Sequence, residues 1–485
     1  MKIVPLFGSG VTGKSMVVTR QRRVNCYYEL RPDGDKAKVV IYGTPGLQFK
    51  FAASSPPNTP VRAWLGVGES SLYALLYNQF QVLTSTGVPS YSAPIGTLAG
   101  LASFAANPAG SQIVLVDGSA GYVYVGGVLT PLTAAWFVPG ALTCTNVGGY
   151  FITEIPNTAN FAVSNINDAT AGSALSIGAA AAYPDTLVAV DNLGGNLVAF
   201  CAQHMEFFQN IGAPPPGQPF ATIQSATNKW GLAAVFSRAQ VDDSLIFLGE
   251  SAQGTRRFAQ IRGYAVQPIS DEIDAIINAT GFVFSDAVAL TYQRDKHPFY
   301  QCTFPTMGRS FLYDCSTGIW GEAQTGIASG AYARHQGNLS TYYAGDTIIS
   351  DYQNSNVYRM EDTAYTDNGA VLPFEVVTRH VTKGFNRFRV PQIYLDFETG
   401  VGINGADGVA GVDPTVSIEC SKDNGRTWYP PRLIKMGRMG QYMTRVKARR
   451  WGQARVFTFR IRLTDPVKRV ITDGAMTIKG KAESR

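Results

Sequence analysis

The strongest constraint on the fold is a repeated unit: a short apolar strand, a turn rich in Asp, Asn, Gly or Ser, and a second strand. Such turns supply residues that tolerate positive φ or bond to their own backbone, as a hairpin between twisted strands requires. Hairpins repeated along the chain without alternating helices favour a β-propeller or several β-sandwiches. The repeats share a pattern rather than a strict motif, so the sequence does not fix the number of blades. The unit occurs at residues 72–87, 111–127, 185–210, 243–263 and 309–323.

The composition agrees with a mainly β chain. The protein has 485 residues and a mass of 52.2 kDa, more than one small core usually organises, so we expect two or three structural units. It contains 50 glycines and 11% aromatic residues, which suit short strands and many turns better than helices. Only 16% of the residues are charged, against about 25% in an average soluble domain, which excludes a disordered or coiled-coil chain.

The sequence divides into three parts. Residues 1–50 are expected to form an irregular N-terminal arm that ends in an entry strand, and residues 51–370 a propeller-like body. From residue 371 the strands become longer, which predicts a second, basic β domain of sandwich or barrel-like form over residues 371–485. The best helix signal lies at residues 270–280, where Ser270 is placed to cap the first turn. The predicted fold class is mainly β.

Several kinds of site and location are disfavoured. No stretch reaches the roughly 18 uninterrupted apolar residues that a membrane helix needs, and the first apolar run stops at Gly8, so we expect neither a membrane span nor a secretory signal. The six cysteines are scattered without a CxxC pair, which is typical of small apolar residues in a reduced compartment. The histidines at positions 204, 297, 335 and 380 lie far apart. We therefore expect no metal site and no cofactor.

Charge is unevenly distributed along the chain. From Arg432 onward there are fifteen basic residues and three acidic ones, whereas the preceding part has 26 basic and 32 acidic residues. Near the end of the chain, basic side chains alternate with Val446 and Ala448, so one face of a strand there would be cationic and the other buried. A solvated surface explains such a face, and so does contact with phosphates or with acidic side chains of a neighbouring subunit. The candidate contact residues are Arg445, Lys447, Arg449, Arg450, Arg460 and Arg462.

Residues 8–15 match the phosphate-loop pattern GxxxxGK[ST], in which Lys14 would reach the terminal phosphates of a nucleotide. A working loop needs a buried strand before it and a helix after it. Here Pro5 interrupts the preceding segment, and β-branched and aromatic residues follow. We interpret the match as a flexible glycine-rich arm. Taken at face value, it would indicate an ATP-dependent packaging factor.

A second motif, SKDNGRTW, fits the aspartate-box pattern S-x-D-x-G-x-T-W. We interpret it as a device that fixes a hairpin, because the aspartate accepts turn amides, the glycine takes the left-handed conformation and the tryptophan packs back onto the sheet. Sialidases carry several such boxes after an FRIP segment, and FRVP at residues 388–391 is similar. A propeller-based glycan-binding or sialidase-like protein is therefore an alternative, although too few residues follow Phe388 for a sialidase propeller. The box residues are Ser421, Asp423, Gly425, Thr427 and Trp428.

Several segments, in order along the chain, resemble the tail-nozzle proteins of short-tailed bacteriophages, a family also called packaged-DNA stabilisation or tail-hub proteins. No single motif is diagnostic, and residues 50–180 match only in their general pattern of short strands and turns. The ordered series carries the resemblance. The segments are residues 21–29 (QRRVNCYYE), 42–47 (YGTPGL), 187–212, 229–270, 416–428 and 440–467.

The resemblance implies a structural subunit that carries a propeller and assembles as a ring, expected to be a homohexamer, below the portal and adaptor. Such a ring extends the DNA channel, retains the packaged genome until ejection and carries fibres or spikes on its outside. The expected partners are further copies of itself, the tail adaptor and portal, fibres or spikes, and the DNA that passes through. The location implied is the virion tail, after synthesis in the host cytoplasm. The protein is not expected to be an enzyme, since the sequence lacks nucleophile-elbow and zinc-protease signatures.

Overall fold

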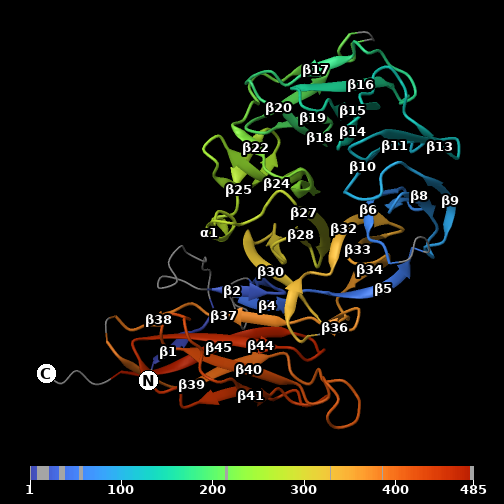
Figure 1. The fold of residues 1–485 in the computed structure, drawn as a ribbon. Coiled ribbons are helices and arrows are strands. Elements are labelled where there is room, and N and C mark those ends of the chain that lie inside the picture. Colours follow the sequence, from blue (N-terminus) through green and yellow to red (C-terminus); the bar gives the residue numbers. More distant parts are fainter. Residues whose placement is uncertain are drawn as a thin grey trace.

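The computed structural model confirms the mainly β fold class, with a β-propeller stacked on a β-sandwich (Figure 1). Antiparallel pairing dominates, and the connections between strands are mostly short turns. The structure describes residues 2–7, 21–31, 39–53, 58–213, 217–327, 329–384 and 386–480.

The described residues form seven blades, of which six are separate sheets and the sixth is one end of an 11-stranded sheet that continues into the sandwich. The strands of the first four blades lie in sequence order. The first blade consists of β6 (Val61–Val67), β7 (Ser71–Leu76), β8 (Gln79–Leu83) and β9 (Pro89–Pro94). The second consists of β10 (Ser103–Ala106), β11 (Gln112–Val116), β12 (Gly121–Val125) and β13 (Val128–Pro131). The third consists of β14 (Cys144–Val147), β15 (Tyr150–Glu154), β16 (Asn160–Ile166) and β17 (Ile177–Ala179). The fourth consists of β18 (Leu187–Leu193), β19 (Asn196–Cys201), β20 (Met205–Asn210) and β21 (Phe220–Thr222).

In the fifth blade, two short strands pair with the same neighbour, β24. Its strands are β22 (Trp230–Leu232), β23 (Ala239–Val241), β24 (Ser244–Ser251), β25 (Arg256–Arg262) and β26 (Ala265–Pro268). The sixth blade consists of β27 (Val288–Arg294), β28 (His297–Phe304), β29 (Arg309–Asp314) and β30 (Ile319–Gly326), with β31 (Tyr332–Arg334) beside β30. The seventh consists of β32 (Gly337–Tyr343), β33 (Asp346–Asp351), β34 (Asn356–Glu361) and β5 (Gly46–Ala52).

The propeller is closed by a strand that precedes the first blade in sequence. β5 pairs antiparallel with β34, so the seventh blade takes its outer strand from the beginning of the chain. On the inner side, β32 of the seventh blade packs against β6 of the first. Gly66 on β6 donates its N–H to Thr341 Oγ1 at 2.9 Å, and a Cβ at Gly66 would overlap the carbonyl oxygen of Tyr342. Only glycine allows this close approach between the two blades.

The C-terminal unit is a two-layer sandwich whose inner faces share one buried apolar cluster. One sheet has the order β3 (Cys26–Leu30), β4 (Val39–Gly43), β45 (Val470–Gly480), β39 (Phe388–Phe397) and β42 (Val446–Arg449). In the same sheet, β1 (Lys2–Pro5) pairs with β45, and β43 (Gln453–Ala454) pairs with β39. The other layer has the order β37 (Phe374–Val377), β44 (Val456–Leu463), β40 (Thr415–Ser421) and β41 (Arg432–Lys435), with β38 (Val381–Thr382) beside β44.

Continuous hydrogen bonding joins the sandwich to the propeller. β2 (Arg22–Val24) pairs in parallel with β30 of the sixth blade and antiparallel with β37 of the sandwich. The Arg22 guanidinium donates to Glu322 of the blade at 2.9 Å and to Glu375 of the sandwich at 3.2 Å. A hairpin of β35 (Thr366–Asp367) and β36 (Ala370–Val371) lies at the same junction (Figure 1). Strands from the beginning of the chain thus enter both units, and the domain boundaries at residues 50 and 370 stay predictions.

The helix expected at residues 270–280 is reduced to a single turn, α1 (Asp274–Ile277). Ser270 does not cap it, because the N-cap position is Ile273. The Ser270 hydroxyl instead accepts the N–H of Phe258 on β25 at 2.8 Å and donates to the Asp274 carboxylate. The Ser270 hydroxyl therefore bonds to the neighbouring strand β25 instead of capping the helix.

Candidate contact surface on the sandwich

The cationic strand predicted from the sequence is β42, at the edge of its sheet. Lys447 and Arg449 are exposed, while Val446 and Ala448 between them are buried in the sandwich core. This is the alternation that a strand with one covered face produces. The exposed side of β42 therefore presents two basic side chains at a sheet edge.

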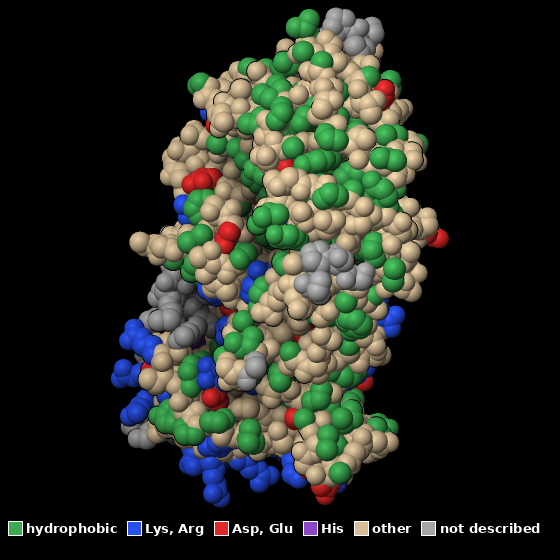
Figure 2. All heavy atoms as spheres, turned by 45° about the vertical axis from the view of Figure 1, so that its right-hand side comes forward, with side chains coloured by type: hydrophobic (Ala, Val, Ile, Leu, Met, Phe, Trp, Pro, Cys, Tyr) green, Lys and Arg blue, Asp and Glu red, His purple; other side chains and the backbone are tan. Residues whose placement is uncertain are grey.

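The basic surface continues across the same sheet. Arg389 on β39 lies directly opposite Lys479 on β45, and both are exposed. Like charges in directly opposite positions destabilise a sheet unless an anionic group lies close to them. Lys and Arg side chains gather at the lower end of the molecule in Figure 2, over the sandwich. An acidic partner on this end would relieve the repulsion.

Two further candidate residues flank β42. Arg445 donates to both carboxylate oxygens of Asp396, at 2.6 and 3.0 Å, and this hydrogen-bonded ion pair raises the pKa of Arg445. Its charge is thus partly balanced within the chain. Arg450 is exposed and has a positive φ of 64°. The guanidinium of Arg432 bonds to the carbonyl oxygens of Arg449 and Arg450, which fixes the backbone at the end of the strand.

Arg460 and Arg462 lie on β44, in the other layer of the sandwich. Both are half-buried and paired within the chain, Arg460 with Glu419 and Arg462 with Glu375, the latter at 2.5 Å. The Arg460 guanidinium also lies 4.4 Å from the ring centre of Trp428. Because outward-facing residues of two packed sheets point away from a common core, these arginines do not join the surface around β42. A contact role for any of the six basic residues stays a prediction.

The aspartate-box residues form a tightly bonded turn after β40. The Ser421 hydroxyl donates to Asp423 at 2.6 Å and accepts the N–H of Gly425 at 2.8 Å. The Asp423 carboxylate also accepts the N–H of Thr427 at 2.9 Å and its hydroxyl at 2.5 Å. These bonds from Ser421 and Thr427 lower the pKa of Asp423 to about 2. Gly425 has a φ of 80°, the left-handed conformation, and half-buried Trp428 lies beneath the Arg460 guanidinium.

The phosphate-loop match and the FRVP segment lie outside the aspartate-box turn. The phosphate-loop match at residues 8–15, with Lys14, lies outside the described residues. The FRVP segment lies in β39, where Arg389 is an exposed strand residue. FRVP and the aspartate box, which motivated the sialidase-like alternative, both belong to the sandwich rather than to a blade.

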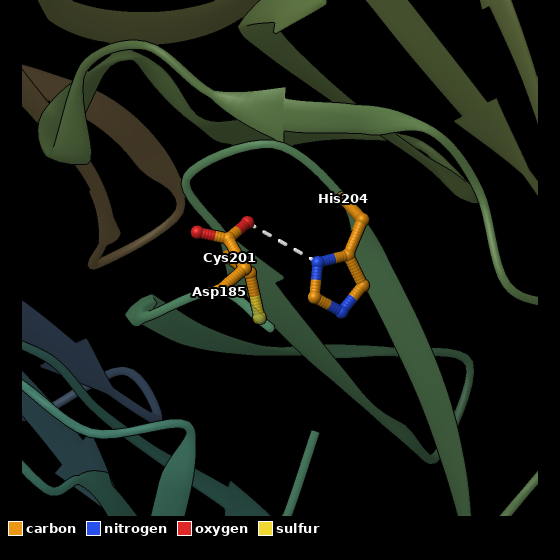
Figure 3. A group of neighbouring side chains, drawn as sticks. All are labelled: Asp185, Cys201 and His204. Atoms are coloured by element: carbon orange, nitrogen blue, oxygen red, sulfur yellow. Dashed lines mark hydrogen bonds and ion pairs between the residues drawn. The ribbon is translucent and has the colours of Figure 1, made fainter. Parts of the chain in front are cut away.

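One cluster of potential metal-binding side chains was not predicted from any sequence motif. Asp185, Cys201 and His204 come together in the fourth blade (Figure 3), with one donor atom from each lying within 4.8 Å of the others. Glu206 contacts the far side of the His204 ring, 3.2 Å from Nε2. Burial, and then the charges of Asp185 and Glu206, raise the pKa of the Cys201 thiol. The Cys-x-x-His spacing was a local signal, but nothing in the sequence linked Asp185 to it.

Two protein-family models match nearly the whole chain. The model described as "Bacteriophage P22 Gp10, beta-propeller" matches residues 4–365. The model described as "Bacteriophage P22 Gp10, beta-sandwich" matches residues 373–479. The search of curated proteins found no match.

Two solved structures of low similarity match this chain, one of them titled a β-propeller domain. The Cps50 (Swd1) β-propeller domain of Myceliophteria thermophila has a TM-score of 0.41 and 7% identity, with 65% of this chain and 100% of that one covered. The extracellular domain of BT4673 from B. thetaiotaomicron has a TM-score of 0.41 and 7% identity, with 69% of this chain and 45% of that one covered.

No helix within the described part of the chain has the length and apolar character to cross a bilayer.

Proposed function

The chain belongs to the bacteriophage P22 Gp10 family of structural phage tail proteins, and from that premise we propose that it is a ring-forming subunit of the tail nozzle. Six copies would form a ring below the portal and adaptor. The ring would extend the DNA channel, retain the packaged genome and carry fibres or spikes, without catalysis. The observation that carries this proposal is the match of both family models, one after the other, over nearly all of the sequence.

The closed fold supports a load-bearing role. A propeller whose last blade borrows a strand from the start of the chain opens only if that pairing breaks. The sheet that runs through β2 couples the sixth blade to the sandwich, so force on one unit reaches the other through backbone hydrogen bonds. A subunit that holds a genome under pressure needs this kind of mechanical continuity.

The basic surface around β42 is the proposed contact between this subunit and its neighbours or the adaptor. A channel that lets DNA slide is poorly served by strong phosphate contacts, because each neutralised phosphate adds salt-sensitive affinity. We therefore favour acidic protein surfaces as the main partners of Lys447 and Arg449. Contact of part of this surface with DNA is the second possibility.

The test compares wild type with Lys447→Glu/Arg449→Glu, by mass measurement and negative-stain imaging, alone and with the adaptor. We expect the wild type to form a ring, either alone or when the adaptor is added, and the charge-reversed variant to lose it. The variant Lys447→Arg/Arg449→Lys keeps both charges and should assemble normally. A wild type that stays monomeric with its adaptor would refute the ring, and normal assembly after charge reversal would refute the assigned surface.

The two alternative functions have direct tests of their own. Nucleotide-dependent thermal stabilisation that disappears in Lys14→Ala would indicate an ATP-binding packaging factor. Binding on a glycan array, or turnover of a fluorogenic sialoside, would indicate a glycan-directed protein.

A further inference from the structure

The turn between β19 and β20 holds two potential metal ligands in fixed positions. The N–H of Cys201 donates to the carbonyl oxygen of His204 at 2.9 Å, which closes the turn. The N–H of Ala202 donates to the carbonyl oxygen of Thr186 at 3.0 Å, which ties the turn to the segment before β18. Cys201 is fully buried and His204 is only 1% exposed. The thiol and the imidazole are therefore held in place by the backbone that carries them.

Asp185, in the segment before β18, is the third member of the group. Its carboxylate accepts the N–H of Thr186 at 2.8 Å and that of Gln203 at 2.5 Å, so its position is fixed from both segments. Its Oδ2 lies 3.2 Å from Nδ1 of His204. In Figure 3 the carboxylate and the sulfur of Cys201 both approach the same side of the imidazole ring. Sulfur, nitrogen and oxygen donors thus lie within 4.8 Å of one another.

The distance between the aspartate and histidine donors agrees with a tetrahedral ion. Zinc binds nitrogen and oxygen at about 2.0–2.2 Å, so two such ligands at the tetrahedral angle lie roughly 3.3 Å apart. The distance of 3.2 Å between Asp185 Oδ2 and His204 Nδ1 fits two ligands of one zinc ion as well as it fits a hydrogen bond. Cysteine, histidine and aspartate together form a donor set that zinc and other borderline-soft divalent ions accept.

The contact between Glu206 and Nε2 of His204 favours metal binding at Nδ1. Glu206 is 2% exposed, lies 3.2 Å from Nε2 of His204, and is held by the N–H of Ala182 at 2.8 Å. Metal-binding histidines commonly donate their second N–H to such a carboxylate, which leaves the other nitrogen with a free lone pair. With Nε2–H given to Glu206, the Nδ1 lone pair faces Asp185 and Cys201, and a cation between them would satisfy all three groups.

We propose that Asp185, Cys201 and His204 bind one divalent transition-metal ion, with Zn²⁺ as the expected occupant and Glu206 orienting the histidine. Binding releases the thiol proton to solvent, because the ligand is the thiolate. Water completes the coordination, since the Asp185 side chain is 10% exposed and gives access from solvent. The competing state is metal-free, with the His204 ring held by its contacts with Asp185 and Glu206.

The ion would have a structural role at the junction of the fourth and fifth blades. It would clamp the segment before β18 to the β19–β20 turn. The same turn packs against β22 of the fifth blade, where a Cβ at Gly231 would overlap the backbone of Ala202. A fixed turn therefore supports the contact between the two blades, and loss of the metal should loosen it.

The experiment measures metal in the purified full chain, expressed with added zinc, by elemental mass spectrometry. A titration of chelator-treated protein with Co²⁺ then follows the thiolate-to-cobalt charge-transfer absorption. We expect one zinc per chain, saturable cobalt absorption and a higher melting temperature with zinc than with chelator. Cys201→Ser should lose the absorption, whereas Cys302→Ser, a change of another buried thiol in the sixth blade, should keep it.

Three results would overturn the proposal. One is folded wild-type protein without bound metal and without cobalt absorption, which would leave the metal-free state. Another is cobalt absorption that persists in Cys201→Ser, which would place the metal elsewhere. The third is bound metal without thiolate absorption, which would exclude Cys201 as a ligand. If Cys201→Ser does not fold, the cobalt titrations of the wild type and of Asp185→Asn test the site instead. We expect weaker cobalt binding in Asp185→Asn. Unchanged binding would count against the site.

Discussion

At the scale of single residues, a buried carboxyl group lies where the two units meet. Asp367 is fully buried and accepts the N–H of Leu47 at 3.3 Å and the hydroxyl of Thr325 at 2.5 Å. Burial raises its pKa to about 6, against the opposing effect of the Thr325 hydrogen bond and the charge of Arg469. Arg469 in turn donates to the carbonyl oxygen of Thr44 at 3.0 Å. The junction therefore contains a group that titrates near neutral pH.

Asp367→Asn should flatten the pH dependence of stability. Because the folded pKa is raised above the unfolded value near 4, the stabilising contribution of Asp367 is complete below about pH 4 and is lost as the pH rises through 6. The shift corresponds to at most roughly 3 kcal/mol. We expect melting temperatures measured from pH 4 to 8 to fall less with pH in the Asn variant. Its stability at pH 7 should match or exceed that of the wild type.

The control for this prediction is Asp423→Asn in the aspartate box. The pKa of Asp423 is lowered to about 2, so its contribution is present above about pH 4 and is lost only as the pH falls toward 2. This variant should shift the whole curve between pH 4 and 8 without changing its slope. Parallel curves for wild type and Asp367→Asn would contradict the assigned titration.

At the scale of elements, the seam between β6 and β32 closes the ring of blades. The backbone of β6 approaches β32 so closely at Gly66 that any side chain would meet the carbonyl oxygen of Tyr342. The interior has little room to adjust, because folded proteins are packed as densely as organic crystals. Closure of the ring therefore depends on one residue without a side chain.

Gly66→Ala should destabilise the protein by about 2 kcal/mol or more, since overpacking typically costs 1–3 kcal/mol and backbone cannot move aside as a side chain can. Chemical denaturation measures the loss, and hydrogen exchange should show increased opening in the first and seventh blades. Gly96→Ala is the matched control, because the nearest atom to its Cβ would be the Tyr122 hydroxyl at 3.4 Å. Equal stability of the two variants would show that the contact between β6 and β32 accommodates a methyl group.

The short strand β2 depends on a shared arginine. Arg22 pairs with Glu322 and Glu375, and these charges raise its pKa despite the opposing effect of burial. Arg22→Ala should cost about 1–3 kcal/mol in chemical denaturation, because buried carboxylates lose a partner while Arg309 and Arg462 still contact them. Adding Glu322→Gln should recover part of the loss. A double variant no better than the sum of the single ones would refute the coupling.

At the scale of the whole molecule, the beginning of the chain ties the propeller to the sandwich. β3 and β4 lie in a sheet of the sandwich, β2 lies between the units, and β5 completes the seventh blade. The turn between β4 and β5 is thus a direct covalent link between the two cores. The two units are therefore joined both covalently and through the sheet that contains β2.

We expect one calorimetric unfolding transition for the full chain, since the two units share a sheet and unfold together. Inserting a short Gly-Ser segment after Thr44, between β4 and β5, should weaken this coupling and broaden or split the transition. The same insertion after Gly126, in a β12–β13 turn where a Cβ would meet nothing within 4 Å, should leave one transition. Two separate transitions in the unmodified protein would contradict the coupling.

The sequence by itself determined the kind of elements. Turn residues and alternating side chains act over a few neighbouring positions, so hairpins, the mainly β class and the two-sided pattern of β42 were readable from local signals. The ordered series of segments also pointed to the family that the two models match. The predicted capping role of Ser270 was wrong because its hydroxyl bonds to the neighbouring strand β25, a contact that the local pattern does not reveal.

Only the tertiary structure decided how these elements join. The closing strand β5 and the bridge through β2 depend on long-range pairings such as that of Arg22 with Glu322, which are 300 positions apart. It also placed Arg460 and Arg462 in a different sheet from β42, and it brought Asp185 to Cys201 and His204. Such contacts follow from how whole sheets pack, and a pattern of period two carries no information about which distant strand becomes the neighbour.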